Sequence, residues 1–304
     1  MGRFLTKRIL MAAITLFVII TVTFFIMFLV PGGPFQSEKM SPQMLKIINA
    51  NYGLDRPIPV QYLDYIGKLL KGDLGISFKR KGYPVMEIIA EKFPVSARLG
   101  GCAIIVGVLM GVPFGVLAAY KRNKLIDRII MFICTLGIAL PSFVIGTVLL
   151  YTFGIYLKWL PAVGLKTPWH YVMPVLALSL SPTCYITRLM RSSMLDVMGQ
   201  DYLKTARSKG LSEGVVLFKH ALRNSILPVI TYLGPMTTMV IAGSFVTERI
   251  FSIPGLGQYF ITSINNRDYS MIMGTTIFFA MLLIAANLIV DVLYTIVDPR
   301  IKLD

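Results

Sequence analysis

Residues 201–228 read DYLKTARSKGLSEGVVLFKHALRNSILP, a polar stretch with apolar segments on both sides. Asp201 can cap a first short helix, because a carboxylate there accepts from unpaired backbone N–H groups. Gly210 stands where a helix commonly ends in a left-handed residue. A second helix follows, and its apolar side chains are spaced along one face: Val215, Phe218 and Leu222. We therefore predict a helical hairpin that joins two hydrophobic segments and needs a surface to dock against.

The composition indicates an integral membrane protein. The 304 residues are 55% hydrophobic and 15% charged, whereas soluble domains carry about 25% charged residues. Apolar runs of about 20 residues recur, and this is the length of a transmembrane helix. Ten-residue segments of alternating apolar and polar residues, which are typical of membrane β-barrels, do not recur in this sequence. We expect an all-α protein with six spans, at about 9–30, 97–120, 129–150, 174–190, 227–247 and 269–290.

The expected domains are the N-terminus with the first span (1–30), an extramembrane lobe (31–95) and a five-helix core (96–304) that carries the loop 191–226. Within the lobe, residues 60–71 have the spacing of a short helix that GDLG ends. The third span contains Pro141. The second span contains five glycines, which permit close approach of another helix: Gly100, Gly101, Gly107, Gly111 and Gly115.

The positive charge is concentrated in loops between the spans. The net charge is +15, but no basic face with interleaved aromatic residues occurs, so we expect no nucleic-acid partner. Six spans place both termini on one side of the membrane. The loops on that side hold 16 Lys and Arg residues, and the two short opposite loops hold four. By the positive-inside rule, both termini and the hairpin face the cytoplasm.

Sequence signatures of enzymes and ion-coupled carriers are missing. The chain has no GxxxxGK[ST] phosphate loop, no Ser-His-Asp arrangement and no HExxH motif. Its three cysteines match no metal-binding spacing. Asp291 is the main ionisable residue expected inside a span, whereas carriers commonly place several there. A membrane enzyme and an ion-coupled secondary transporter are therefore the remote alternatives to a pore-forming subunit that is driven by another chain.

Eight phrases of the sequence resemble one family, in order and along nearly the whole chain. They are VPGGPF (30–35), YGLDRPIPVQYLDYIGKLLKGDLGISF (52–78), FPVSARLG (93–100), TRLMRSSMLDV (187–197), TARSKGLSE (205–213), IFSIPGLGQ (250–258), NRDYSMIMG (266–274) and IVDVLYTIVDPRI (289–301). The chain resembles permease subunits of ABC importers of the oligopeptide and dipeptide branch, and most of all the B-type subunit. This resemblance implies a type I importer permease with six transmembrane helices and an extracytoplasmic lobe after the first.

The hairpin resembles the cytoplasmic loop through which such permeases couple to their ATPases. In that loop a glycine follows an alanine by four residues, and a leucine-proline pair opens the next span. Lys204 stands where a glutamate is general, and the leucine-proline pair lies about five residues later than usual. Both departures resemble the peptide branch. The resemblance assigns ATPase coupling to eight residues: Lys204, Thr205, Ala206, Arg207, Gly210, Leu211, Leu227 and Pro228.

The resemblance further implies an ATP-driven importer of several chains. A homologous C-type permease would share the pathway, and two P-loop ATPase subunits would hold ATP and Mg at the cytoplasmic face. An extracytoplasmic peptide-binding protein would deliver the substrate. This chain would be a multi-pass protein of the bacterial cytoplasmic membrane, with no cofactor or metal of its own. Oligopeptides are the expected substrate, and dipeptides, glutathione or nickel chelates are the alternatives.

Two assignments stay open at the level of sequence. Polar residues within the spans suit a water-filled pathway, but packing by small residues explains them about as well: Ser142, Ser181, Thr237, Thr238 and Ser244. The lobe suits docking of the delivering protein, and a structural cap over the spans is an equal alternative.

Overall fold

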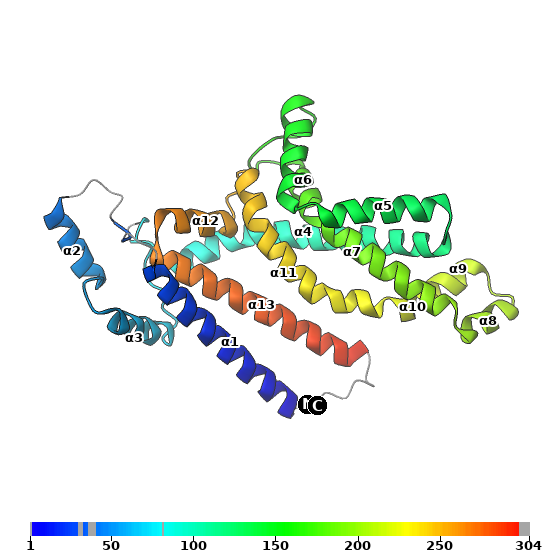
Figure 1. The fold of residues 1–304 in the computed structure, drawn as a ribbon, viewed down its shortest axis with the longest axis horizontal. Coiled ribbons are helices and arrows are strands. Elements are labelled where there is room, and N and C mark those ends of the chain that lie inside the picture. Colours follow the sequence, from blue (N-terminus) through cyan, green and yellow to red (C-terminus); the bar gives the residue numbers. More distant parts are fainter. Residues whose placement is uncertain (1, 30–32, 36–40, 81, 298–304) are drawn as a thin grey trace. The chain divides into compact units, whose positions relative to one another are not determined.

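The computed structural model describes residues 2–29, 33–35, 41–80 and 82–297, and most of them are helical. The helices are α1 (Gly2–Leu29), α2 (Pro42–Tyr52), α3 (Ile58–Leu69), α4 (Val85–Tyr120), α5 (Leu125–Ala139), α6 (Ser142–Leu149), the π-helical η1 (Leu150–Tyr156), the 3-10 helix η2 (Pro168–Tyr171), α7 (Val172–Met198), α8 (Asp201–Ser208), α9 (Glu213–Val215), the π-helical η3 (Val216–Ala221), α10 (Leu222–Ser225), α11 (Leu227–Ile250), α12 (Leu256–Asn266) and α13 (Tyr269–Val297). Figure 1 shows these elements in sequence colours.

Five helical segments are long and apolar enough to cross a membrane. They are Thr6–Leu29, Val85–Tyr120, Pro168–Met198, Leu227–Ile250 and Tyr269–Ile289. The helix α5 passes the same test together with α6 and η1, which are bent by 102° at the break between them, and the pair makes a sixth span if it is taken as one. The predicted all-α membrane fold is confirmed, with five to six apolar helical segments long enough to cross a membrane.

The prediction of one continuous third span was wrong at Pro141. Leu140 takes extended angles (φ −88°, ψ 125°), as does Pro141 (φ −60°, ψ 142°). A proline disfavours the helical conformation of the residue before it and cannot donate its own backbone N–H. The helix after the break continues through η1 to Tyr156, where the sequence predicted a loop. A second expected loop, 248–268, contains the helix α12.

The chain divides into two compact units, and each one consists of two separate stretches of sequence. One unit comprises residues 1–94 and 255–284, and the other comprises 95–254 and 285–304. The boundary between residues 94 and 95 lies within α4, and the boundary between residues 284 and 285 lies within α13. The predicted domain limits at 30 and 95 stay a prediction.

In the first unit, α1 and α13 share a buried apolar cluster. Ile20, Phe24 and Met27 of α1 lie in this cluster with Met273 and Ile277 of α13. The helix predicted at 60–71 is present as α3, and it packs against the same cluster through tyrosine and aliphatic side chains.

Asp268 joins the lobe to the start of α13. Its carboxylate accepts hydrogen bonds from the Ser77 hydroxyl, from the Phe78 backbone N–H at 3.1 Å and from the Lys79 backbone N–H at 3.3 Å. It also accepts from the Met271 N–H at 3.2 Å, which makes it a cap for α13. Asp268 is buried. One side chain therefore holds together segments that are 190 residues apart in the sequence.

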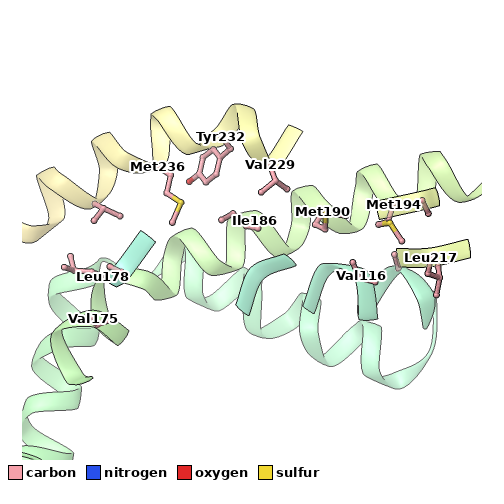
Figure 2. Packing of buried hydrophobic residues seen from close by; sticks show 14 of the residues in the cluster. Val116, Val175, Leu178, Ile186, Met190, Met194, Leu217, Val229, Tyr232 and Met236 are labelled. Atoms are coloured by element: carbon pink, nitrogen blue, oxygen red, sulfur yellow. The ribbon is translucent and has the colours of Figure 1, made fainter. Parts of the chain in front are cut away.

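In the second unit, α7 contacts α5, α6 and α11. Figure 2 shows Val229, Tyr232 and Met236 of α11 on the side of that helix that faces α7. Ile186 and Met190 of α7 lie against Gly111 and Gly115 of α4. These five side chains belong to the buried core of the unit. Between membrane spans this packing is favoured by van der Waals contact rather than by the hydrophobic effect, because lipid tails are as apolar as the side chains that replace them. The central position of α7 makes it the scaffold on which the other helices of this unit are placed.

An ion pair ties the start of α5 to α7, and sequence analysis did not identify it. Arg191 donates from Nε to Asp127 Oδ1 at 2.6 Å and from Nη2 to Oδ2 at 2.8 Å. The same carboxylate accepts from the backbone N–H of Asn123 at 2.8 Å. The Asp127 side chain is 4% exposed and that of Arg191 is 24% exposed. Such a two-pronged pair fixes both distance and orientation of the two helices.

The prediction that glycines bring helices together is confirmed for three of the five. A Cβ atom added at Gly111 would lie 2.9 Å from the backbone oxygen of Thr183, and one at Gly115 would lie 2.8 Å from that of Thr187. At Gly107 it would meet the end of the Met236 side chain. These three residues are spaced four apart, so they share one face of α4. That face therefore lies directly against the backbone of α7.

Gly115→Ala is expected to destabilise the protein by about 1–3 kcal/mol, because overpacking of this size forces a backbone shift. The added methyl group would also lie 2.5 Å from Cβ of Met190. The thermal midpoint of the detergent-solubilised protein measures the effect. Gly101→Ala is the matched control, since nothing lies within 4 Å of a Cβ at that position. Equal midpoints for the two variants would contradict close packing at Gly115.

Candidate functional site: the hairpin 201–228

The first helix of the hairpin, α8, begins at Asp201, the residue that was predicted to cap it. Gln200 occupies the cap position (φ −75°, ψ 146°) and makes no capping hydrogen bond with its side chain. Asp201 is already helical, and its carboxylate accepts from Lys204 Nζ at 2.9 Å. The prediction that Asp201 caps the helix was therefore wrong. Lys204 and Thr205 lie on the exposed side of α8.

The end of α8 explains the four-residue spacing between Ala206 and Gly210. Gly210 has φ +79°, and its N–H donates to the Arg207 carbonyl at 2.9 Å. The Leu211 N–H donates to the Ala206 carbonyl at 3.4 Å. This pair of bonds is the Schellman motif, in which the left-handed residue is usually glycine. The predicted role of Gly210 in the turn is confirmed by this geometry.

Arg207 and Glu213 form an ion pair across the turn. Arg207 donates from Nε to Oε2 of Glu213 at 3.1 Å and from Nη2 to Oε1 at 2.9 Å. The guanidinium holds the pKa of the Glu213 carboxyl below its ordinary value, through the hydrogen bond first and charge attraction second. The pair is part-exposed, so its main effect is to fix the angle between α8 and the second helix rather than to add much stability.

Of the three side chains predicted to form the apolar face of the second helix, Leu222 packs against the core and the other two do not. Val216, Leu217 and Ala221 are buried, whereas Val215 and Phe218 are exposed. Val216, Leu217 and Ala221 lie in the π-helical segment η3. Leu203 and Ala206 of α8 belong to the same buried cluster as these three residues. The small side chain of Ala206 is therefore required for packing within the hairpin itself.

The hairpin is fixed to α7 and continues almost directly into α11. The buried Ser225 hydroxyl donates to Sδ of Met194 in α7 at 2.9 Å. Ile226 has helical angles, and α11 begins at Leu227 with Pro228 in its first turn. Proline is favoured there because its missing N–H would have no partner within the helix. The predicted opening of a span at Leu227 and Pro228 is confirmed.

Four large apolar side chains remain exposed on this otherwise polar hairpin. Phe218 is 67% exposed, and the other three are about 40% exposed: Tyr202, Leu211 and Val215. Tyr202 is held in place by Asn224, whose side-chain amide donates to its hydroxyl at 2.8 Å. Exposed large apolar side chains on a polar segment are candidates for contact with another protein. We call these four residues the apolar patch of the hairpin.

The candidate pathway residues include three whose hydroxyl groups donate within their own helix. Ser244 is buried, and its hydroxyl donates to the carbonyl of Ile241 at 2.8 Å. Thr237 and Thr238 likewise donate to carbonyls of their own helix. Ser142 and Ser181 are half-buried, in α6 and α7. Their assignment to a pathway stays a prediction.

Three further points concern acidic residues and possible metal ligands. Glu248 is fully buried near the end of α11, although the sequence placed it in a loop. The side chain of Asp291, the ionisable residue expected inside a span, lies outside the described residues. Among the described side chains, no group of three His, Cys, Asp or Glu residues is arranged to hold a metal ion.

The membrane-spanning helices define an integral membrane protein, and comparison with known families shows which class it belongs to. Residues 111–303 match the family described as "Binding-protein-dependent transport system inner membrane component", and residues 1–100 match the family of the corresponding N-terminal region. The chain belongs to this family of binding-protein-dependent transport permeases.

Characterised relatives align over the full length of the chain. The dipeptide transport system permease protein DppB of Bacillus subtilis is 44% identical, over 100% of this chain and 99% of the relative. The oligopeptide transport system permease protein OppB of Haemophilus influenzae is 45% identical, over 99% and 100%. OppB of Escherichia coli K12 is 42% identical, over 99% and 100%.

Solved structures show the same fold at low sequence identity. The inward-facing methionine ABC transporter MetNI aligns with a TM-score of 0.60 at 14% identity, over 70% of this chain and 97% of the solved one. An amino acid ABC transporter aligns with a TM-score of 0.54 at 16% identity, over 69% and 94%. The protein is thus an importer permease in fold, and a multi-pass protein of the inner membrane.

Proposed function

We propose that this chain is the B-type permease subunit of an ATP-driven importer of oligopeptides. The hairpin 201–228 carries the proposal, because its apolar patch offers a contact surface and its second helix leads into α11. A homologous C-type permease completes the pathway, and two P-loop ATPase subunits with ATP and Mg bind at the cytoplasmic face. An extracytoplasmic peptide-binding protein docks on the lobe 31–95.

Charge supports the proposed orientation. The hairpin and the turn at 121–128 carry many more Lys and Arg residues than the opposite short loops. Such residues are retained on the cytoplasmic side of bacterial membranes. Both termini and the hairpin are therefore placed in the cytoplasm, where ATPase subunits can reach the patch, and the lobe is placed outside.

The proposed coupling is mechanical. The Schellman turn, the Arg207–Glu213 pair and the Ser225 contact hold the hairpin in one shape. Movement of bound ATPase subunits then displaces the hairpin as a rigid body. Because only Ile226 separates α10 from α11, the displacement passes to Leu227 and Pro228 and tilts the span. Lys204, Thr205, Arg207 and Leu211 lie on or beside the surface that the ATPase contacts.

Peptides of defined length test the substrate. The relatives named for oligopeptides and those named for dipeptides are equally similar to this chain, at 42–45% and 44% identity. Dipeptides are therefore the second candidate, ahead of glutathione and nickel chelates. Proteoliposomes with the complete complex should accumulate labelled peptides of three to six residues only when ATP is supplied. Uptake driven by a proton gradient without ATP would contradict the proposal.

Phe218→Ser is expected to weaken binding of the ATPase subunits about tenfold or more, since a central aromatic contact commonly contributes over 1–2 kcal/mol. Binding of purified ATPase subunits to the permease in nanodiscs measures this. Lys219→Gln is the matched control, because it is the exposed neighbour in the same helix. If the two variants bind the ATPase equally well, the apolar patch is not the contact surface.

A further inference from the structure

The lobe helix α3 lies beside the last turns of α1. The Tyr62 hydroxyl and the Thr21 hydroxyl are 2.7 Å apart, and the rings of Tyr62 and Phe24 are 5.2 Å apart. Thr21 lies eight residues before the end of α1 at Leu29, which is about 12 Å along a helix. The helix α3 therefore packs against α1 within the apolar length of that helix. It is amphipathic, which is a property of helices that lie in a membrane interface.

A cavity of about 420 Å³ opens between α1, α3, the segment 73–78 and α13. This volume is in the range of small-molecule sites. Its wall has two distinct parts. Phe24, Phe28 and Met273 from the spans α1 and α13 form an apolar part, and Lys68 and Asp73 belong to a polar part from the lobe. A ligand that fits both parts has an apolar tail and a charged head.

Tyr65 is one of the residues that line the cavity, and its hydroxyl is buried without a hydrogen-bond partner among the described residues. Burial, and then the nearby Asp73 carboxylate, raises the pKa of Tyr65 well above its ordinary value. The phenol is therefore neutral and has a proton to donate. Leaving a buried hydroxyl unpaired costs about 1–3 kcal/mol, which a ligand oxygen would recover.

The charges of the cavity complement a zwitterion. Arg56 and Asp64 are paired with each other at 2.8 Å. Lys68 has no ion-pair partner among the described residues. Asp73 accepts from the Gly75 N–H through Oδ1, so Oδ2 is left to accept from a ligand. The cavity thus offers a cation and a phenol for an anionic oxygen, and a carboxylate oxygen for an ammonium group.

We propose that this cavity binds a membrane phospholipid whose headgroup carries a phosphate and a primary ammonium, as in phosphatidylethanolamine. The phosphate lies against Lys68 and the Tyr65 hydroxyl, and the ammonium donates to Asp73. One acyl chain lies along Phe24, Phe28 and Met273. A zwitterionic peptide shares the ammonium and the anion, but it has no long apolar tail for the wall formed by the spans.

Native mass spectrometry of the full-length permease tests the proposal with three lipids of identical acyl chains. Phosphatidylethanolamine should bind about tenfold more tightly than phosphatidylcholine, whose methylated amine has no proton to donate, and than phosphatidylglycerol, which has no amine. Lys68→Gln and Tyr65→Phe should each weaken phosphatidylethanolamine binding, by about tenfold and about threefold. Lys71→Gln and Tyr83→Phe are matched controls, because both residues are exposed in the lobe and neither lines the cavity.

Equal binding of phosphatidylcholine and phosphatidylethanolamine would overturn the assignment of the ammonium to Asp73. Unchanged binding in both Lys68→Gln and Tyr65→Phe would overturn the site itself. Tyr65→Phe removes only an oxygen, so it keeps the test valid if Lys68→Gln disturbs the lobe. A free tripeptide that binds with the same dependence on Lys68, while the lipid does not, would assign the cavity to peptide instead. Peptide uptake by the wild-type complex is measured separately, so failure here leaves the proposed import function standing.

Discussion

Gly210→Val is expected to leave the protein inserted in the membrane while uncoupling ATP hydrolysis from uptake. The glycine has φ +79°, and a left-handed conformation costs an ordinary residue about 1–2 kcal/mol, with β-branched residues least tolerant. Space is not the obstacle, because nothing lies within 4 Å of an added Cβ. The strain acts on the Schellman turn, so α8 loses its fixed angle to the second helix. Uptake by reconstituted complexes should fall about tenfold or more, with ATPase activity retained.

Gly210→Asn is the matched control for this effect. Asparagine also adds a Cβ and a polar group, but it adopts the left-handed conformation far more readily than valine. It should retain most of the uptake. Purified Gly210→Val complexes with normal peptide-stimulated ATPase activity and normal uptake would contradict the role of the turn. Loss of activity in both variants would show that added volume, rather than backbone conformation, matters there.

Asp127→Ala is expected to lower the free energy of unfolding by about 3 kcal/mol, near the lower end of the range for breaking a buried ion pair. The Arg191 guanidinium would be left part-buried without its carboxylate. The Asn123 N–H would also lose its acceptor, in a turn where Asn123 has φ 62°. Denaturant unfolding of the protein in detergent micelles measures the change, with Arg128→Gln as the control at an exposed neighbouring charge.

The double variant Asp127→Leu with Arg191→Met separates the charge effect from loss of packing. Replacing both partners by apolar groups leaves no buried charge unpaired, and such replacements are often close to neutral. Most of the stability lost in Asp127→Ala should therefore return. A double variant as unstable as the single one would mean that the pair itself, rather than avoidance of an unpaired arginine, holds α5 against α7.

The structural features that were predicted correctly from the sequence are those set by one residue or by residues adjacent in the sequence. The left-handed turn at Gly210, the start of α11 at Pro228 and the close approach at Gly111 each follow from the chemistry of one residue type. The spans follow from long apolar runs. Phrases of the hairpin also resembled a family, which the alignment of the whole chain to that family then confirmed.

The features that sequence missed depend on distant partners or on a local departure from α-helical geometry. Asp127 and Arg191 are 64 residues apart, and nothing in either segment indicates the other. Leu217 is buried and Phe218 is exposed within the π-helical segment η3, and the sequence did not indicate a departure from α-helical geometry there. The sequence shows a proline at position 141 within the third span. A proline alone does not determine whether the helix kinks mildly or bends by 102°, as it does here.

The bonds of Asp268 set an order of events during synthesis. Phe78 emerges from the ribosome 190 residues before its partner Asp268. At about 5–20 residues per second, this interval is on the order of 10–40 s. During that interval the backbone N–H groups of Phe78 and Lys79 cannot yet bond to the Asp268 carboxylate, because Asp268 has not been synthesised. The lobe, although it lies near the start of the chain, therefore completes its structure among the last parts of the protein, once the sixth span has begun to form.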